Sequence, residues 1–281
     1  MNYRNIINKG KLILKKYSIL NADVDAELLL SISLKKSREK ILLNSENTLN
    51  QNQINSYFKL VDRRSKKEPI SFITGKRFFW NADFVVNKNV LTPRFETELL
   101  IDELLKIYKN LKNIKVLDVG IGSGCILISL LMEKKNWKGY GIDISKSALK
   151  IAKTNAKIQQ VGNRIEFIHS DIDNFNYGKY DLIVSNPPYI NKIDYNNLGL
   201  EVKAYEPFEA LYGGVDGTKI IEKVIKKSSV ILKKNGLLAM EVGLGQHYKV
   251  SYLLKKNGFY VSKTIKDYQN IKRFFLAKKT N

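Results

Sequence analysis

The sequence predicts an α/β fold: a mostly parallel, doubly wound sheet with helices on both faces, preceded by an all-helical N-terminal domain and a β-hairpin linker. Three observations predict this organisation. After Lys112, β-prone runs alternate with runs of helical periodicity, which is typical of a parallel sheet with crossover helices. Residues 1–67 carry apolar residues at helical spacing, whereas the next stretch is rich in aromatic and β-branched residues. We therefore expect domains at 1–67, 68–92 and 93–281.

The N-terminal helices are indicated by apolar stripes. The clearest stripe follows Asn50, a candidate N-cap, and comprises Ile54, Tyr57, Phe58 and Val61. Two further helices are expected around Ile13, Leu14 and Tyr17, and around Ala26, Leu29 and Leu30. We interpret each stripe as a face that packs into a core.

The linker is expected to form a short hairpin over residues 70–91. Its β-prone residues are Phe72, Phe78, Phe79, Trp80, Phe84, Val85 and Val86, with Gly75 and Asn81 as turn residues. A helix then runs from Leu99 to Tyr108, and Pro93 lies outside it because proline is not tolerated in a helix interior. Further strands are expected at 115–119, 139–144, 164–169, 180–185, 237–242, 259–265 and 274–277, with helices beginning near 122, 145, 218 and 246.

The composition disfavours several classes of site. The 281 residues include one cysteine and two histidines, which excludes an intramolecular disulfide and a cysteine-rich zinc site and disfavours a histidine-based one. The longest apolar run, Cys125 to Met132 with Ser129 inside it, is far shorter than the roughly 20 residues of a membrane helix. The N-terminus lacks the apolar core of a secretory signal. We therefore expect a cytoplasmic protein with no membrane span and no structural metal.

The charge balance is strongly basic, with a formal net charge of +21. Such a balance favours a nucleic-acid-rich partner. However, only eight of the 48 basic residues are arginine, the better ligand for phosphate, and the lysines are spread along the whole chain. Lysine, asparagine and isoleucine all have A/T-rich codons, so a biased genome would also produce this composition. Both explanations stay open.

A glycine-rich loop leaves a predicted buried strand and enters a helix, with the sequence Asp118-Val119-Gly120-Ile121-Gly122-Ser123-Gly124. Glycines permit a tight turn and let a ligand approach the backbone closely. In a parallel sheet this loop lies at the carboxyl edge, where ligands bind. Asp143 ends the next strand, and its carboxylate can accept hydrogen bonds from both hydroxyls of a ribose.

The glycine spacing separates two classes of cofactor. A nicotinamide dinucleotide requires Gly-x-Gly-x-x-Gly or Ala, but Cys125 holds the third position and the extra glycine is Gly124. This spacing suits a nucleoside without a pyrophosphate, and Asp118 suits a cationic amino-acid tail. Together with Asp143, these features predict S-adenosylmethionine. Asp171, after the third strand, is either a contact to the adenine amine or a surface turn residue.

A second motif, Asn186-Pro187-Pro188-Tyr189, follows the predicted strand 180–185. Two consecutive prolines are rigid and donate no backbone hydrogen bond. The Asn186 side-chain oxygen and the Pro187 carbonyl can accept the two hydrogens of a neutral NH₂ group, on which Tyr189 can stack. Preorganised dipoles then aim a weakly nucleophilic nitrogen at a methyl donor. Adenine, guanine and a glutamine amide all fit, and an ordinary Asn-Pro turn is the structural alternative.

The combination of these motifs resembles the bacterial release factor glutamine methyltransferases, a family of class I S-adenosylmethionine-dependent enzymes. Members pair a helical N-terminal domain and a hairpin linker with a Rossmann-like catalytic domain. The resemblance spans nearly the whole chain. The matching stretches are Asp25-Ala26-Glu27-Leu28-Leu29, Glu68-Pro69-Ile70, Thr74-Gly75, Phe79-Trp80, Pro93-Arg94, Thr97-Glu98, Asp118-Val119-Gly120, Gly122-Ser123-Gly124, Ser185-Asn186-Pro187-Pro188-Tyr189-Ile190, Tyr205-Glu206-Pro207, Ala210-Leu211 and Gly213-Gly214.

The resemblance implies methylation of the glutamine side-chain amide in the Gly-Gly-Gln motif of class I peptide chain release factors, in support of translation termination. It implies that the cofactor contacts Asp118, Gly120, Ile121, Gly122, Ser123, Gly124, Asp143, Asp171, Ile172 and Asn186. Catalytic roles are implied for Asn186, Pro187 and Tyr189. The resemblance also implies that the substrate contacts these three residues together with Pro188, Arg94 and Glu98. Two positions depart from the family: Phe95 replaces a second proline, and Ile172 replaces an aromatic residue near the adenine. They put pocket rigidity and cofactor affinity in question.

Two other functions are weighed against this one. A nucleic-acid adenine or guanine methyltransferase shares the loop and the tetrad, but it is not expected to share Pro93-Arg94 with Glu98, or Tyr205-Glu206-Pro207. A non-catalytic nucleic-acid-binding protein with a decayed cofactor fold is disfavoured by the intact motifs. Glu98 as a helix N-terminal carboxylate and Glu206 as a surface turn residue remain open. Nothing in the sequence requires direct nucleic-acid binding or more than a monomer.

Overall fold

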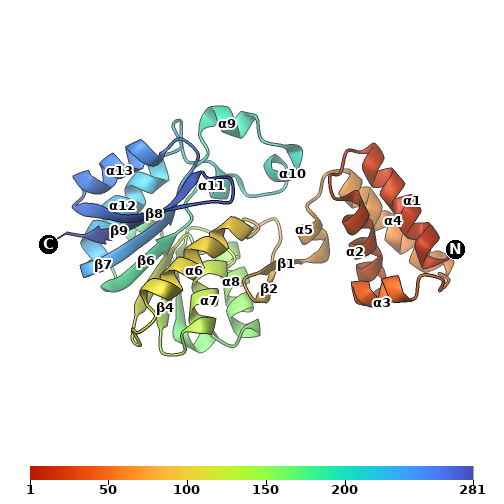
Figure 1. The fold of residues 1–281 in the computed structure, drawn as a ribbon, viewed down its shortest axis with the longest axis horizontal. Coiled ribbons are helices and arrows are strands. Elements are labelled where there is room, and N and C mark those ends of the chain that lie inside the picture. The colour runs from red at the N-terminus through yellow and green to blue at the C-terminus, as the bar shows by residue number, and fades with distance from the viewer. Residues whose placement is uncertain (281) are drawn as a thin grey trace. The chain divides into compact units, whose positions relative to one another are not determined.

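The computed structural model describes residues 1–280, which divide into two compact units (Figure 1). Unit 1 comprises Met1–Lys76 together with Gly199–Tyr205, and unit 2 comprises Arg77–Leu198 with the chain from Glu206 onward. Among the described residues, no helix has both the length and the apolar character needed to cross a membrane.

Unit 1 is built from helices packed around one apolar core. Its elements are α1 (Tyr3–Lys16), α2 (Ala22–Leu34), α3 (Arg38–Leu43), α4 (Gln51–Ser65), α5 (Ile70–Thr74) and α10 (Leu200–Lys203). The sequence prediction for α4 is confirmed: Asn50 and Gln53 form a reciprocal capping box, and Tyr57 and Val61 are buried. The prediction that Tyr17 belongs to the apolar stripe of α1 is wrong, because Tyr17 is the C-cap of the helix and is 52% exposed.

Within unit 1, the buried side chain of Arg64 joins the N-terminal helices to a segment that is distant in sequence. Arg64 donates to Asp25 at 2.7 Å, and both side chains are buried. Its remaining nitrogens donate to the Glu68 carbonyl at 2.9 Å and to Glu201 at 3.3 Å. Glu201 lies in the Gly199–Tyr205 segment of the same unit, so a piece of chain following the tetrad belongs with the helices.

The buried hydroxyl of Tyr57 offers a stability prediction. It has no hydrogen-bond partner among the described residues, and it lies so close to α1 that a Cβ at Gly10 would be 1.9 Å from it. Because an unsatisfied buried hydroxyl is destabilising, Tyr57→Phe should raise the free energy of unfolding by about 1 kcal/mol. Chemical denaturation measures the change. Tyr3→Phe is the control, because the Tyr3 hydroxyl accepts a hydrogen bond from Lys36 at 3.1 Å; lower stability in Tyr57→Phe would contradict the prediction.

The linker differs from its prediction at its start. Residues 70–74 form the short helix α5 and not a strand, with Pro69 at its N-cap and Gly75 at its C-cap with φ of 74°. The hairpin consists of β1 (Lys76–Phe79) and β2 (Ala82–Val85). It is fixed within unit 2, since the Asn155 side chain accepts from the Val85 N–H at 2.7 Å and donates to the Val85 carbonyl at 3.0 Å.

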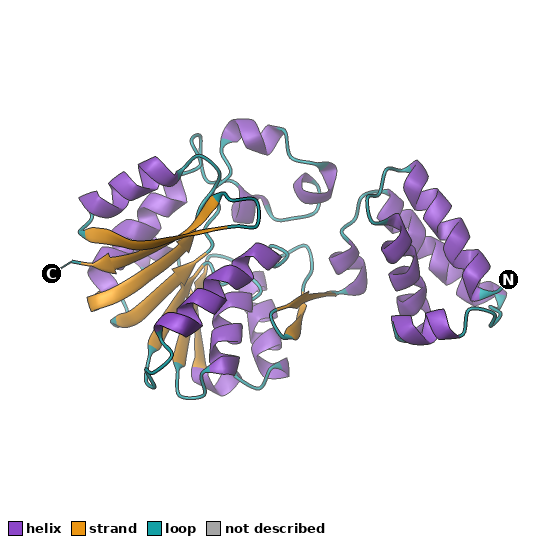
Figure 2. Cartoon of the chain, in the orientation of Figure 1, coloured by secondary structure: helices purple, strands orange, loops and turns teal. Residues whose placement is uncertain are grey.

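Unit 2 is a sheet with helices on both faces, as the sequence predicts (Figure 2). The strand order is β5-β4-β3-β6-β7-β9-β8; neighbouring strands are parallel from β5 to β7, and β9 pairs antiparallel with both of its neighbours. The strands are β3 (Lys115–Val119), β4 (Lys138–Asp143), β5 (Ile165–His169), β6 (Tyr180–Ser185), β7 (Leu232–Glu241), β8 (Phe259–Lys266) and β9 (Lys272–Lys279). The helical elements are η1 (Phe95–Thr97), α6 (Glu98–Ile107), α7 (Cys125–Glu133), α8 (Lys146–Ile158), η2 (Gly162–Arg164), η3 (Ile172–Asn174), α9 (Lys192–Asn196), α11 (Phe208–Leu211), α12 (Lys219–Ile231) and α13 (His247–Lys256).

Side chains alternate between the two faces of this sheet. Val116 and Leu182 pack with α6, α7 and α8, whereas their neighbours Leu117 and Ile183 pack with α12 and α13. Because both faces are covered, the middle of each central strand is apolar, as in Val116-Leu117 of β3 and Leu182-Ile183-Val184 of β6, which is typical of parallel sheets. The two apolar layers hold the strand ends, and the loops that follow them, in fixed positions.

Candidate functional site

The carboxyl ends of the parallel strands bring the predicted site segments to one edge of the sheet. In the strand register Val119 pairs with both Ile142 and Ser185, and Asp143 pairs with His169. The glycine loop, Asp143, the 170–172 turn and the Asn-Pro-Pro-Tyr tetrad therefore follow neighbouring strands. This edge is where parallel α/β sheets bind ligands.

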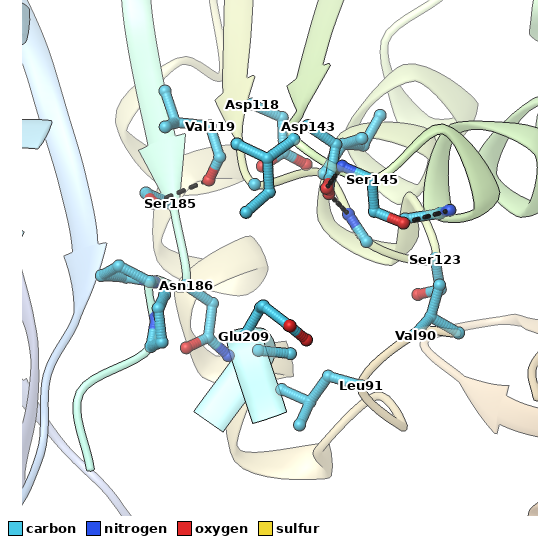
Figure 3. Close-up of a pocket in the computed structure, with 18 of the residues that line it drawn as sticks. Val90, Leu91, Asp118, Val119, Ser123, Asp143, Ser145, Ser185, Asn186 and Glu209 are labelled. Carbon is cyan, nitrogen blue, oxygen red and sulfur yellow. Dashed lines mark hydrogen bonds between the residues drawn. The ribbon is translucent and has the colours of Figure 1, made fainter. Parts of the chain in front are cut away.

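A cavity of about 720 Å³ opens at this edge (Figure 3). That volume is in the range of small-molecule sites. The predicted residues that line it are Arg94, Asp118, Gly120, Ile121, Gly122, Ser123, Asp143, Asp171, Ile172, Asn186, Pro187 and Pro188. Asn186 points into the cavity from one side, while Asp118 and Asp143 lie on the side of the glycine loop.

The glycine loop adopts backbone conformations that other residues rarely take. Gly120 has φ of 72° with open space around it, so the conformation itself requires glycine. Gly124 does not line the cavity; it is the N-cap of α7, and a Cβ there would lie 2.6 Å from the Ile128 side chain. The close contact with Ile128 and the φ of 83° are therefore the observed reasons for this third glycine.

Two aspartates behind and beside the loop have perturbed acidity. Asp118 is 2% exposed, and burial raises its pKa to about 7, with the Asp143 charge adding to the rise. Asp143 accepts from the Gly122 N–H at 3.0 Å and from the Ser145 N–H at 2.8 Å. Burial also raises the pKa of Asp143, although these two hydrogen bonds oppose the shift. Asp143 thus ties the loop to the start of α8.

The turn after β5 combines a polar and an apolar residue. The Asp171 side chain accepts from the Asp173 N–H at 2.8 Å and lies 3.8 Å from Lys223. Ile172 is buried and contributes an apolar side chain to the cavity wall. The structure therefore brings both residues to the cavity, with the Asp171 carboxylate already engaged as the N-cap of η3.

The tetrad begins directly after β6. The Ser185 hydroxyl donates to the Val119 carbonyl at 2.8 Å, which ties the start of the tetrad to β3. Tyr189 does not line the cavity, and its hydroxyl donates to Glu241 at 3.1 Å. Burial raises the pKa of Tyr189, with the Glu241 charge adding to the rise, so this phenol stays protonated at neutral pH. The geometry makes Tyr189 a partly buried support of the tetrad.

Two stretches that carry the family resemblance contact each other. Arg94 pairs with Glu206 at 2.5 Å, and the Glu206 side chain is 2% exposed. Glu206 is consequently not a surface turn residue, because its carboxylate is buried against the arginine that lines the cavity. The pair fixes residues 93–94 against 206–207, and both segments contribute to the cavity wall.

The structure does not bring Glu98 to the cavity. Its carboxylate accepts from the Trp80 N–H at 2.8 Å, at the turn of the hairpin, and it begins α6. The substituted Phe95 also faces elsewhere, since it stacks on Tyr268 with ring centroids 5.6 Å apart. Glu98 and Phe95 therefore contact residues that do not line the cavity, and the sequence pattern gave no indication of these partners.

Sequence reasoning missed other residues of the wall. Leu91 and Glu209 point into the cavity, and Glu209 faces the side of Asn186 (Figure 3). A signal for Glu209 was present, because it lies between Tyr205-Glu206-Pro207 and Ala210-Leu211. Glu241, which does not line the cavity, gave no such signal, since it lies one residue before the end of the predicted strand 237–242 and belongs to no motif; burial raises its pKa, and hydrogen bonds from Thr97 and Tyr189 oppose the rise. Residues 1–280 contain no group of three or more metal-ligating side chains that could hold an ion.

Comparisons with known proteins agree with this architecture. Residues 5–75 match the family model described as the PrmC N-terminal domain, and residues 95–200 match the methyltransferase small domain. A release factor glutamine methyltransferase of Caulobacter vibrioides is 37% identical over 267 residues, which cover 95% of this chain and 92% of that protein. The chain belongs to the release factor glutamine methyltransferase family. The family resemblance found in the motifs is thereby confirmed.

Longer relatives and solved structures extend this comparison. A bifunctional methyltransferase of Rickettsia bellii is 34% identical over 96% of this chain but 53% of that protein, so the chain spans about half the length of this relative. The crystal structure of a ribosomal protein L11 methylase from Lactobacillus delbrueckii subsp. bulgaricus has a TM-score of 0.51 and 18% identity, covering 67% of this chain and 81% of that one. This second likeness concerns the fold alone, which is the methyltransferase α/β fold expected for the family.

Proposed function

We propose that the protein transfers a methyl group from S-adenosylmethionine to the side-chain amide nitrogen of the glutamine in the Gly-Gly-Gln motif of class I peptide chain release factors. The observation that carries the proposal is that Asn186 and Pro187 line the same cavity as the glycine loop and Asp143. A planar nitrogen and a nucleoside-bearing methyl donor can thus meet there. The family membership selects a glutamine amide among planar nitrogens.

The chemistry follows from the donors and acceptors of the tetrad. A primary amide nitrogen is a weak nucleophile because its lone pair is delocalised. The Asn186 side-chain oxygen and the Pro187 carbonyl would accept its two hydrogens and hold the lone pair toward the methyl group. The bond from methyl carbon to sulfur would break as the bond to nitrogen forms, S-adenosylhomocysteine would leave, and the methylated nitrogen would release its proton to solvent water. Fixed dipoles and positioning supply the rate enhancement, so no strong base is needed.

The residues around the loop fit S-adenosylmethionine, which supplies a methyl group on a cationic sulfur. Asp143 at the end of β4 would accept hydrogen bonds from the ribose hydroxyls. The backbone of the glycine loop would lie against the nucleoside. The buried carboxyl of Asp118 would face the cationic amino-acid tail. Ile172 and Ile121 offer apolar wall to the adenine, and Asp171 is the candidate partner of its amine. No metal ion is part of this proposal.

The acidity of Asp118 gives a testable pH dependence. Because its folded pKa is about 7, the carboxylate that attracts the cationic tail is lost as pH falls through 7. We expect the affinity for S-adenosylmethionine to fall about tenfold from pH 8 to pH 6. Isothermal titration calorimetry across this range measures it. Asp118→Asn should bind weakly with no such acid limb; wild-type affinity of this variant at pH 8 would refute the assignment.

The remaining roles concern the substrate protein. We propose that residues 1–67 recognise the release factor, that 68–92 link this region to the catalytic part, and that 93–281 form the methyltransferase domain. The pairing of Arg94 with Glu206 would shape the wall near the glutamine. The protein would act in the cytoplasm, as a monomer, and direct binding of nucleic acid would not be required.

The basic charge is expected to speed the encounter with an acidic release factor. With a net charge of +21, opposite charge on the partner would steer association, and added salt would screen it. We therefore expect the association rate to fall steeply, by about tenfold or more, between low and physiological ionic strength. Stopped-flow mixing with labelled release factor measures the rate. A flat dependence on salt would assign the charge to composition alone.

The deciding experiment is a methyl-transfer assay with labelled cofactor. Purified release factor, its Gln→Ala tip variant, total RNA and total DNA are offered side by side. Label on the release factor that disappears in the tip variant would establish the proposed function. Label on nucleic acid alone would overturn it in favour of an exocyclic-amine methyltransferase, the alternative that the comparisons do not favour.

A further inference from the structure

We propose that Glu241 and Gln246, at the carboxyl end of β7 and the start of α13, are positioning residues that hold Tyr189 from two sides and so fix the backbone of the tetrad. This inference rests on the proposed function, because it concerns the same site. It assigns roles to two polar side chains that lie outside the cavity wall.

The tetrad needs anchors from outside itself. Pro187 and Pro188 have no backbone N–H, so two consecutive residues of the turn cannot donate to the surrounding structure. The carbonyl of Pro187 must stay free if it is to accept a hydrogen from the substrate amide. The turn therefore depends on the residues that flank the two prolines.

The first flank is anchored by Ser185, whose hydroxyl donates to the Val119 carbonyl at 2.8 Å. The second flank is Tyr189, and it is held at both ends. Its hydroxyl donates to Glu241 at 3.1 Å, and its carbonyl accepts from the Gln246 side chain at 2.8 Å. Asn186 and Pro187 thus lie between one anchor to β3 and two anchors to the end of β7 and the start of α13.

Glu241 is placed for this role by the sheet itself. Ser185 pairs with Met240 in the register of β6 and β7, so Glu241 adjoins the first residue of the tetrad. Its second carboxyl oxygen accepts from the Thr97 hydroxyl at 2.8 Å. A buried carboxylate can only accept hydrogen bonds, and here each oxygen has one hydroxyl donor. Glu241 therefore joins the tetrad to the 93–98 stretch.

Both the nitrogen and the oxygen of the Gln246 side-chain amide make hydrogen bonds. The nitrogen donates to the Tyr189 carbonyl at 2.8 Å and to the Gly217 carbonyl at 3.2 Å, and the oxygen accepts from the Gly243 N–H at 2.8 Å. Three segments thus meet at one side chain. A carboxylate of the same shape would place an acceptor against two carbonyl oxygens.

The 213–217 loop packs so closely that the tetrad backbone has no room to move toward it. A Cβ at Gly213 would lie 2.6 Å from the Pro188 carbonyl oxygen, and a Cβ at Gly217 would lie 2.3 Å from that of Tyr189. The loop is paired with the chain beyond the tetrad, since the Gly213 N–H donates to the Ile190 carbonyl at 2.9 Å. Gln246 joins this packed layer to β7.

The test compares Gln246→Glu, Gln246→Ala and Glu241→Gln with the wild type in single-turnover methyl transfer to release factor. We expect the transfer rate at saturation to fall about ten- to hundredfold in Gln246→Glu, because a small displacement of reacting groups has an effect of this size. Gln246→Ala should lose less, since it removes the donor without adding repulsion. The dissociation constant of S-adenosylmethionine should stay within about twofold of wild type, because neither side chain lines the cavity.

A double-mutant cycle tests whether Glu241 acts through Tyr189. Tyr189→Phe removes only the hydroxyl, so Tyr189→Phe combined with Glu241→Gln should be no slower than the slower single variant. Gln159→Glu is the matched control for Gln246→Glu. The Gln159 side chain also donates to a backbone carbonyl, that of Asp83 at 3.0 Å, but this carbonyl lies in the hairpin strand β2 and not in the tetrad. It should keep the wild-type rate.

Hydrogen exchange supplies a readout that does not depend on activity. In Gln246→Glu the amides of residues 190–192 and 213–219 should exchange faster, whereas those of unit 1 should not change. Wild-type rates and unchanged local exchange in all three variants would overturn the inference. If wild-type protein leaves the release factor unlabelled, the proposed function fails, and faster local exchange in Gln246→Glu would still support the anchoring role.

Discussion

Replacing Asn186 by alanine is expected to lower the rate of methyl transfer by about a hundredfold or more, an effect comparable to the loss of one preorganised polar contact in other enzymes. Asn186 points into the cavity at the end of β6, where no other side chain of the tetrad offers an acceptor to the substrate amide (Figure 3). Without its oxygen, the amide nitrogen keeps one hydrogen unpaired and its lone pair is no longer aimed. Single-turnover kinetics with saturating cofactor measures the loss.

Two controls separate this effect from a general disturbance of the site. Calorimetry should give a dissociation constant for S-adenosylmethionine within about twofold of wild type, because a residue that acts on the transition state changes the rate more than ground-state binding. Asn186→Asp keeps an acceptor of the same shape and should lose less than the alanine variant. Turnover of Asn186→Ala near the wild-type level would show that the tetrad does not hold the reacting nitrogen.

The fold was predictable wherever local signals and tertiary packing agree. The helix after Asn50 has a capping residue, a reciprocal Gln53 and an apolar stripe, and the structure shows α4 with that cap. The apolar strands of the doubly wound sheet were equally clear, because burial on both faces leaves few polar positions. Strand 180–185 was predicted at both of its ends, since a turn and the tetrad bracket it.

The sequence misled where short-range propensity and context disagree. Residues 70–74 are β-prone, but Pro69 before them and Gly75 after them permit one helical turn, and Ser71 and Ile73 bury there. The assignment of Gly199–Tyr205 to unit 1 could not be predicted either. The segment contacts the helices through Glu201, which accepts from Arg64, and through the Tyr205 hydroxyl, which donates to the Lys66 carbonyl; these residues share no motif.

The parts of the candidate site that belong to a sequence motif were predictable. The glycine loop, Asp143 and Asn186 lie on one cavity because their strands are neighbours. The family resemblance implies a substrate contact for Glu98 as for Arg94, but a helical turn begins between them, and the Glu98 carboxylate accepts from the Trp80 N–H. Glu241 could not be found, because its partners Thr97 and Tyr189 are brought to it only by the folded sheet.

Replacing Asp143 by alanine is expected to weaken S-adenosylmethionine binding by about ten- to hundredfold, which corresponds to the loss of charge-assisted hydrogen bonds. Two contributions lead in the same direction. The proposed contact with the ribose hydroxyls disappears, and the Gly122 N–H, 3.0 Å from the carboxylate, loses its acceptor, so the glycine loop is less firmly held. Calorimetric titration of the cofactor measures the sum of both.

The two contributions can be separated by a conservative variant and a neighbouring acid. Asp143→Asn keeps one acceptor for the loop N–H groups but only a weak one for the ribose, so it should recover part of the affinity lost in Asp143→Ala. Asp173→Ala removes an acidic side chain that pairs with Lys223 and does not line the cavity, and it should bind the cofactor as wild type does. Should Asp143→Ala retain the wild-type dissociation constant, the ribose assignment would be wrong, and Asp143 would serve only to hold the Gly122 and Ser145 backbone.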